Sequence, residues 1–279
     1  MSEQGYIKKD RNIEGILDQL YASEDSLEIL DNINEITQTY FNNLCTSPRK
    51  SRREVRERAW STEEYTLEKL LSASRYAAGG FACGDEGMLR FSKWLVAHTE
   101  PSFKPAIGEN PTRLSSRTQL NNCSRYINTI NKLIVSRRID IIVFIASGGQ
   151  PVASLISFYS GTPIVGLRYS HFTRDDKKVL YPKNSGFEHY EKLFRDKNVL
   201  VVDDVIDTGE TMEKVANFLK KTGANEIYLS AADSSYTLGK KEYENLSRSG
   251  TYAVLKLRKY TKAVKKKERE PFFHQDWEP

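Results

Sequence analysis

Eight consecutive residues, "IDIIVFIA" (139–146), most constrain what this chain can fold into. After Asp140, apolar and largely β-branched side chains follow one another without alternation, which is typical of a strand that is buried on both faces. Further strand-like runs lie at 162–169, 198–204 and 225–233, and helical patterns separate them. Strands that alternate with helices predict an α/β fold, with a parallel sheet that helices cover on both sides.

The residues before this sheet have a different character. Segment 12–44 repeats its apolar residues at intervals of three and four, as an amphipathic helix does, and segment 61–80 begins with a Ser or Thr cap and ends at a Gly pair. A further helix is predicted over 84–101, closed by Pro101, and a Pro-, Gly- and Ser-rich linker over 101–116. The predicted organisation is a helical N-terminal region (1–120), an α/β core (121–260) and a C-terminal tail (261–279).

The composition is that of a cytoplasmic globular protein. No apolar run approaches the roughly 18 residues that span a membrane, and the first 15 residues lack the apolar stretch of a secretory signal. Three cysteines, Cys45, Cys83 and Cys123, stand far apart and in no metal-ligand spacing. The odd number fits reduced thiols, and the cysteine spacing together with the absence of an HxxxH-like pair predicts no dedicated zinc site.

Basic residues concentrate in two stretches, 48–58 and 256–269, while the whole chain carries a formal charge of +5. Solvated faces explain such stretches, and so does attraction to polyphosphate or nucleic acid. Charge alone does not decide between these readings.

Unusual residues follow three of the predicted strands, where ligands bind in parallel α/β sheets. They are Ser-Gly-Gly-Gln at 147–150, Arg-Tyr-Ser-His at 168–171 and the acidic run at 203–211. The turn Thr208 to Thr211 opens a predicted helix, so its backbone N–H groups form an anion site. Two carboxylates just upstream, Asp203 and Asp204, suit sugar hydroxyls or magnesium. The acidic run therefore predicts a site for a phosphorylated sugar.

The stretch "NVLVVDDVIDTGETM" (198–212) resembles the phosphoribosyl pyrophosphate (PRPP) signature of type I phosphoribosyltransferases. It has that signature's apolar strand, two acids, two apolar residues and Asp-Thr-Gly-x-Thr. The resemblance extends more loosely over 121–235, where "IASGGQPVA" is similar to the family's pyrophosphate loop and 170–197 occupies the place of its mobile loop. It implies the Rossmann-like parallel sheet of that family.

The resemblance also implies a role for each matching residue. The catalytic group comprises Asp203, Asp204 and Asp207, of which Asp203 and Asp204 bind the ribose hydroxyls, partly through Mg²⁺. The 5-phosphate is held by Asp207, Thr208, Gly209, Glu210 and Thr211. Pyrophosphate is held by Ser147, Gly148, Gly149 and Arg168, and the mobile loop contributes Arg174, Lys177 and Lys178.

The implied reaction transfers the 5-phosphoribosyl group from PRPP to a nitrogenous base and releases pyrophosphate. A purine-like acceptor is slightly favoured, although the region after the fourth predicted strand lacks the Lys of 6-oxopurine enzymes. In the pyrophosphate loop, Ser147 stands where many members of the family have a basic residue. Phe272, Phe273 and Trp277 in the tail either stack on the base or dock on their own domain. Residues 1–120 are expected to cap the active site or to form the interface of a homodimer.

Other protein classes fit the acidic run less well. A response-regulator receiver needs a later strand that ends in an acid, and "TYAVLKL" (251–257) carries none. A phosphate-loop nucleotidase needs GxxxxGK[ST], which is absent. A regulator that senses PRPP, without catalysis, and binds nucleic acid or a protein remains the alternative to an enzyme.

Overall fold

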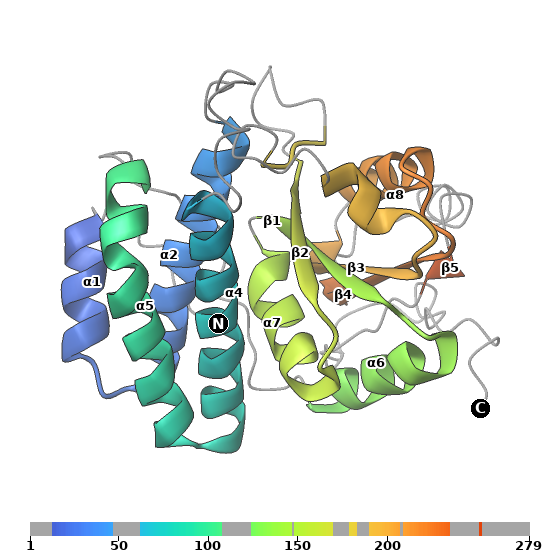
Figure 1. Ribbon diagram of the computed structural model, residues 1–279. Coiled ribbons are helices and arrows are strands. Elements are labelled where there is room, and N and C mark those ends of the chain that lie inside the picture. The colour runs from blue at the N-terminus through green and yellow to red at the C-terminus, as the bar shows by residue number, and fades with distance from the viewer. Residues whose placement is uncertain are drawn as a thin grey trace, which may run out of the picture.

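The computed structural model describes residues 13–46, 62–107, 124–146, 148–169, 179–182, 190–206, 209–234 and 251–252. Within these residues a helical layer stands beside a parallel sheet (Figure 1). The helices of the layer are α1 (Ile13–Ala22), α2 (Ser26–Thr46), α4 (Thr62–Cys83) and α5 (Glu86–Ile107). None of the helices in the described part of the chain is long and apolar enough to cross a membrane.

The five strands pair in parallel in the order β2-β1-β3-β4-β5, as the sequence predicts for an α/β fold. Strand β1 (Ile141–Ala146), which lies between β2 and β3, is buried along its whole length. Its burial confirms the reading of the unbroken apolar run. The other strands are β2 (Ile164–Arg168), β3 (Val199–Ile206), β4 (Ile227–Ser234) and the short β5 (Thr251–Tyr252).

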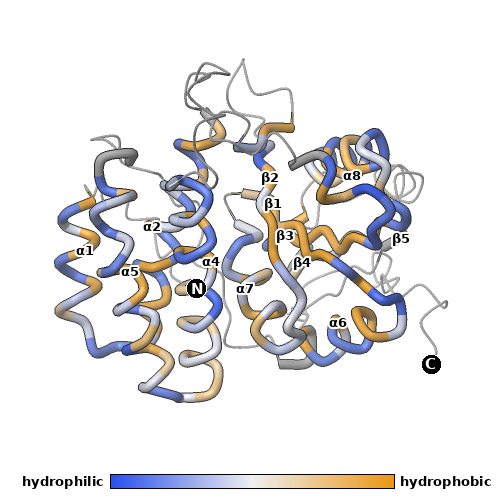
Figure 2. The backbone as a smooth tube through the Cα atoms, viewed as in Figure 1, coloured by the Kyte–Doolittle hydropathy of each residue, from blue (hydrophilic) through white to orange (hydrophobic). Residues whose placement is uncertain are grey.

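Helices cover both faces of this sheet. On one face α6 (Ser124–Arg137) and α7 (Gly149–Ser160) pack with alternate strand residues, Phe144 and Val202 among them. On the other face α8 (Glu210–Lys221) and a 3-10 helix, η2 (Tyr190–Phe194), pack on the intervening residues. The strands form an apolar centre between helices that are polar on their outer sides (Figure 2).

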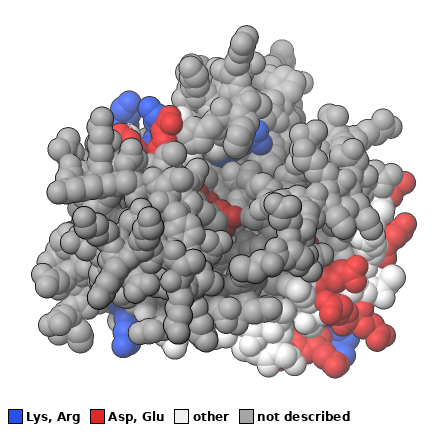
Figure 3. All heavy atoms as spheres, turned by 180° about the vertical axis from the view of Figure 1, so that it is seen from behind, with Lys and Arg blue, Asp and Glu red and all other residues white. Residues whose placement is uncertain are grey.

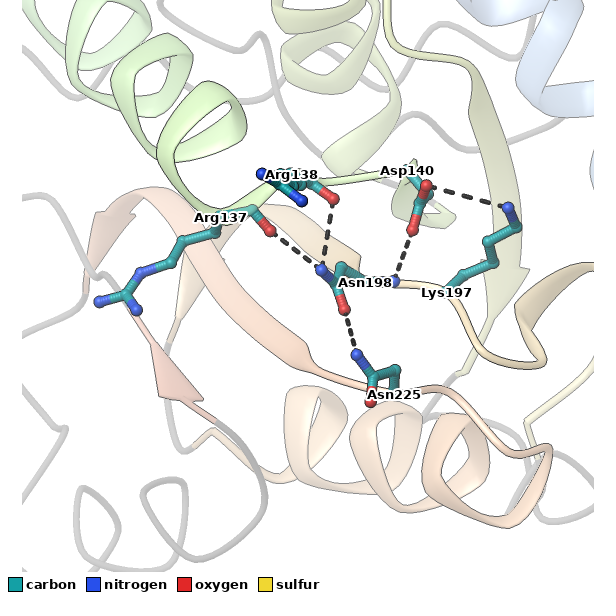
Figure 4. Close-up of polar contacts among 6 residues, drawn as sticks. All are labelled: Arg137, Arg138, Asp140, Lys197, Asn198 and Asn225. Carbon is teal, nitrogen blue, oxygen red and sulfur yellow. Dashed lines mark hydrogen bonds and ion pairs between the residues drawn. The ribbon is translucent and has the colours of Figure 1, made fainter.

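A polar network ties the amino-terminal edge of the sheet together (Figure 4). The Asn198 backbone N–H donates to Asp140 Oδ2 at 2.9 Å, and its side-chain amide donates to the Arg137 carbonyl at 3.0 Å. Asn225 Nδ2 donates to Asn198 Oδ1 at 2.7 Å, and Lys197 pairs with Asp140. These contacts join the starts of β1, β3 and β4, so they fix the register at the edge opposite the predicted site.

The helical layer shares its hydrophobic core with one face of the sheet. Phe41 of α2 packs edge-on against Phe144 of β1, with ring centroids 5.4 Å apart. Gly166 of β2 makes room for both rings, because a Cβ at this position would lie 2.5 Å from Phe144 and 2.6 Å from Phe41. One continuous cluster of buried side chains therefore runs from α1 to the centre of the sheet.

The segment predicted as a single amphipathic helix, 12–44, is broken into α1 and α2. Ser23 Oγ accepts a hydrogen bond from the Asp25 N–H at 3.1 Å, and Asp25 Oδ1 accepts one from the Glu28 N–H at 2.8 Å. Side chains that bond to nearby backbone groups in this way favour helix starts over helix interiors. The break lies where the sequence reads Ser-Glu-Asp.

Two predicted helix ends are wrong. Helix α4 continues through Gly79 and Gly80 to Cys83, because the Gly79 position contacts the ring of Phe158 on α7 and the helix stops only before Gly84, whose φ is +67°. Helix α5 continues through Pro101 to Ile107, into the predicted linker. Burying Phe103, which is fully inaccessible, outweighs the one backbone hydrogen bond that Pro101 removes.

Candidate functional site

The order of the strands creates a switch point between β1 and β3. These strands are neighbours, yet β1 leads into α7 on one face and β3 leads into α8 on the other. In open α/β sheets ligands bind at the carboxyl ends of the two strands where the order reverses. Two of the predicted ligand-binding runs lie here, one after each strand.

Gly148 and Gly149 bring the start of α7 directly against β3. A Cβ on Gly148 would lie 2.0 Å from Asp204 Oδ1, and a Cβ on Gly149 would lie 2.3 Å from the Val202 carbonyl oxygen. Only glycine fits at either position without moving the strand or the carboxylate. The predicted pyrophosphate loop and the predicted ribose-binding acids are therefore in contact.

The paired acids Asp203 and Asp204 lie near the carboxyl end of β3. Part of the Asp203 residue reaches the surface, but its carboxyl group is buried and its Oδ1 accepts a hydrogen bond from the Asp204 N–H at 3.0 Å. Burial, and secondly the neighbouring Asp204 carboxyl, raise the pKa of Asp203 well above its usual range. Strongly perturbed carboxyls of this kind mark candidate functional sites.

Helix α8 begins on the other side of the acid pair. Its first position is preceded by Gly209, which is buried and has a φ of +79°, a left-handed conformation that favours glycine. The N-terminus of a helix presents backbone N–H groups and a partial positive charge to an anion. The helix start therefore offers the anion site that the sequence predicts.

Glu210, the first residue of α8, would repel an anion at this helix start if its side chain pointed toward it. Its Oε1 instead accepts a hydrogen bond from the hydroxyl of Tyr169 at 3.4 Å. Tyr169 follows β2 and is buried, and burial together with Glu210 raises the pKa of its hydroxyl. Sequence reasoning assigned no role to Tyr169, since no local pattern connects it to a partner 41 residues away.

Arg168 closes β2 beside the predicted pyrophosphate loop. It pairs in register with Ala146, the last residue of β1, and its backbone exchanges two hydrogen bonds of 2.8 Å with Leu180. This backbone pairing fixes its place at the sheet edge where the glycine loop begins.

Several predicted site residues lie outside the described part of the chain. They are Ser147, Arg174, Lys177, Lys178, Asp207, Thr208, Phe272, Phe273 and Trp277. The structure therefore places Gly148, Gly149, Arg168, Asp203, Asp204, Gly209, Glu210 and Thr211 of the predicted set, all at the carboxyl ends of β1, β2 and β3 or at the helix starts that follow.

The donor set is suited to magnesium shared with a ligand. In the described residues no three His, Cys, Asp or Glu side chains gather as a protein-only metal site. Asp203 and Asp204 supply two adjacent carboxylates, and Mg²⁺ is commonly held by one or two carboxylates together with phosphate oxygens and water. These two residues would hold the ion if it binds here.

The family of the chain follows from its match to a family model. The model described as "Phosphoribosyl transferase domain" matches residues 115–255, just over half of the chain. The chain belongs to this family. The matched range contains the glycine loop, the acid pair and the start of α8.

Curated relatives match part of this domain. The chain is 39% identical over 86 residues to the ribose-phosphate pyrophosphokinase of Thermococcus kodakarensis. The matched stretch covers 31% of the chain and 29% of that protein. The chain is 32% identical over 98 residues to the hypoxanthine/guanine phosphoribosyltransferase of Methanotorris igneus, which covers 34% of the chain and 54% of the relative. The chain thus spans about a quarter to about a half of the length of these relatives.

Two solved structures named as phosphoribosyltransferases are similar to part of the chain. The purine phosphoribosyltransferase of Pyrococcus horikoshii Ot3 is 26% identical, with a TM-score of 0.36, over 48% of this chain and 81% of that one. The orotate phosphoribosyltransferase of Aeropyrum pernix is 19% identical, with a TM-score of 0.35, over 50% of this chain and 73% of that one.

Proposed function

We propose that the protein is a Mg²⁺-dependent phosphoribosyltransferase that transfers the 5-phosphoribosyl group of PRPP to a nitrogenous base and releases pyrophosphate. One observation carries the proposal: two helix starts, those of α7 and α8, flank a pair of adjacent carboxylates at a switch point. The two helix starts are anion sites, and the carboxylates between them can accept hydrogen bonds from sugar hydroxyls. This arrangement matches a ribose that carries phosphate at one end and pyrophosphate at the other.

Each part of the PRPP molecule is bound by a different set of residues. The start of α8, with Gly209 and Thr211, takes the 5-phosphate, while Gly148 and Gly149 take the pyrophosphate and Arg168 adds positive charge. Asp203 and Asp204 accept hydrogen bonds from the ribose hydroxyls and hold Mg²⁺, which when bound offsets charge on the departing pyrophosphate. Tyr169 keeps the Glu210 carboxylate engaged, which leaves the helix start to the phosphate.

The names of the relatives support a ribose phosphate as the shared ligand. The ribose-phosphate pyrophosphokinase and the hypoxanthine/guanine phosphoribosyltransferase are both named for this group. The acceptor base differs among the relatives, since an orotate phosphoribosyltransferase of Sulfurisphaera tokodaii is 29% identical over 121 residues. We propose a purine-like acceptor on the resemblance of the signature and tail alone.

A regulator that senses PRPP is the second candidate. The chain is 32% identical over 89 residues to the transcriptional regulator GfcR of Picrophilus torridus. The described surface does not favour nucleic acid at α1 and the start of α2, however, because an acidic area lies there at one edge of the molecule (Figure 3). Its exposed carboxylates belong to Glu14, Asp18, Glu24, Asp25 and Glu28.

Base-dependent release of pyrophosphate tests the proposal. The protein is incubated with PRPP and Mg²⁺ against a panel of purine, pyrimidine and pyridine bases, and pyrophosphate is measured. We expect release that requires one base. Calorimetric binding of PRPP with no release by any base would instead support the sensor, and the absence of binding would overturn both candidates.

A matched pair of variants ties the activity to the acids. Asp204→Asn should weaken PRPP binding about tenfold to a hundredfold, the usual effect of losing hydrogen bonds to a charged group. Asp196→Asn is the control, because Asp196 is exposed and its φ of +60° is one that Asn adopts readily. Equal losses in the two variants would remove Asp204 from the site.

A further inference from the structure

We propose that helix α2 of the N-terminal region is a working part of the pyrophosphate side of the site: Asn34 positions Gln150 and, through it, the start of α7. This inference rests on the proposed function, because it concerns how the glycine loop is held for pyrophosphate. It gives the helical region a role within its own subunit, distinct from capping or dimerisation.

Gln150 is the residue directly after Gly149, and it is completely buried. Its Nε2 donates a hydrogen bond to Asn34 Oδ1 at 3.0 Å and a weaker one to Ser154 Oγ at 3.3 Å. Asn34 lies on α2, 116 residues earlier in the chain, and is only 4% exposed. A buried amide pair thus joins the helical region to the residue next to the glycine loop.

The amide pair of Asn34 and Gln150 lies within an apolar core, so it restricts the position of α7 relative to α2. Around it the apolar core is continuous from α2 through α7 to the sheet. Apolar contacts tolerate small sliding movements, whereas a buried amide that loses its partner leaves a polar group desolvated. Gln150 therefore fixes the position of the first turn of α7 along the axis of α2. Apolar packing alone would not fix this position.

The rest of α7 is held by the same region. On α4, a Cβ at Gly79 would lie 2.4 Å from the ring of Phe158, so the far end of α7 sits tightly against this glycine. The two helices stand side by side in Figure 1. The far end of α7 is thus held by α4, and the amide pair holds its start.

A small displacement there has a direct consequence for binding. The Gly148 and Gly149 positions allow no clearance toward Asp204 and the Val202 carbonyl. A shift of the first turn of α7 would separate the backbone N–H groups of the loop from the pyrophosphate position. Helix α8, whose start offers the 5-phosphate site, packs on the other face of the sheet, in a buried cluster that contains no residue of α2.

The test separates the two ends of the substrate. Inorganic pyrophosphate with Mg²⁺, and ribose 5-phosphate, are each titrated into the full chain by calorimetry. We expect Asn34→Leu to weaken pyrophosphate binding about fivefold to tenfold, the usual range for one net hydrogen bond, and to leave ribose 5-phosphate binding unchanged. Asn34→Ala, which adds no bulk to the core, should give the same split.

Thr37→Val is the matched control on the same helix. Thr37 is fully buried, and the hydrogen-bond partners of its Oγ1 lie on α2 and α4: the Ile33 carbonyl at 2.8 Å, the Leu70 carbonyl at 3.2 Å and Ser74 Oγ at 2.9 Å. It should lower the melting temperature comparably and change neither affinity. If both Asn34 variants weaken both ligands equally, or weaken neither, α2 does not position the loop.

Failure of the proposed function would look different. In that case the unaltered protein itself would bind neither pyrophosphate nor ribose 5-phosphate. A double variant, Asn34→Leu with Gln150→Leu, completes the comparison: its pyrophosphate affinity should equal that of Gln150→Leu alone, because the two residues act through one contact. Additive losses would contradict the coupling.

Discussion

At the scale of single residues, the site is built from close contacts that leave no freedom in residue type. Gly148 and Gly149 are required by the approach of α7 to β3, and Gly209 by its backbone conformation. Asp203 is held with its carboxyl group buried and next to a second acid. The glycines fit their positions, whereas the buried Asp203 carboxyl lowers the stability of the free protein at any pH where it would ionise in the unfolded chain.

The buried Asp203 carboxyl makes stability depend on pH in a defined direction. Its pKa is raised in the folded protein by burial and by Asp204, while in the unfolded chain it is ordinary. The folded protein therefore loses stability as pH rises from the ordinary pKa through the raised one. Asp203→Asn removes this loss, so the variant should be more stable than the unaltered protein at pH 8 and should lose most of this advantage near pH 4.

Urea unfolding of both proteins at several pH values measures this difference. Asp196→Asn serves as the control, because Asp196 is exposed and the same substitution there removes a carboxyl that is not buried. A stability advantage of Asp203→Asn that does not change with pH would show that burial of the charge is not its cause. The same variant should bind PRPP poorly, since function and stability oppose each other at this residue.

At the scale of elements, the strands were predictable and several helix ends were not. The runs at 139–146 and 198–204 are strongly apolar, so their own residues predict that β1 and β3 are buried strands. Helix α4 passes a Gly pair and α5 passes Pro101 because of contacts with distant residues such as Phe158 and the core around Phe103.

The same distinction applies to the site. The acid run and the glycine loop are local signals, whereas the pairs Tyr169–Glu210 and Asn34–Gln150 join residues 41 and 116 positions apart. No periodicity relates such partners. Sequence analysis therefore finds the groups that would meet the ligand and misses the groups that hold them in place.

The packing of α4 on α7 gives a prediction at this scale. Gly79→Ala would gain about 1 kcal/mol in helix propensity, but its Cβ would lie 2.4 Å from the Phe158 ring, and overpacking costs about 1–3 kcal/mol. We expect net destabilisation, relieved in part by Phe158→Leu in the same chain. The melting temperatures of the single and double variants measure the effect.

Gly87→Ala, on the neighbouring helix α5, is the control for helix propensity. Its added Cβ would meet only Asp85 Oδ1, at 3.1 Å, which also accepts a hydrogen bond from the Met88 N–H. Asp85 is exposed, so its side chain can shift by a few tenths of an ångström to accommodate the added atom. The substitution should leave stability unchanged or slightly raised. If Gly79→Ala behaves like Gly87→Ala, the contact between α4 and α7 is not tight enough to fix the far end of α7.

At the scale of the whole molecule, the helical region and the sheet share one core. Apolar side chains of α1, α2, α4 and α5 belong to the same buried cluster as Phe144 and Val202 of the strands. The division into residues 1–120 and 121–260 made from the sequence follows the change in pattern along the chain. Because the core is shared, the stability of the sheet depends on the helices. This holds wherever a domain boundary is drawn along the chain.

Cooperative unfolding follows from this shared core. Phe41 of α2 lies between the helices and the sheet, fully buried and edge-on to Phe144. Replacing it by alanine should cost about 3–5 kcal/mol, the usual value for a buried Phe. Because the cluster is continuous, this loss should appear equally in both parts of the chain.

Hydrogen exchange followed by mass spectrometry across a urea series distinguishes the two parts. Peptides from α4 and α5 report on the helices, and peptides from β1 and β3 report on the sheet. In Phe41→Ala both sets should lose protection at the same, lower urea concentration, while Val135→Ala, at a residue that is 79% exposed on α6, should shift neither. If the helices lose protection first and the sheet keeps its original midpoint, the two regions fold independently. Coupling between α2 and the pyrophosphate loop would then have to act through Asn34 and Gln150 alone.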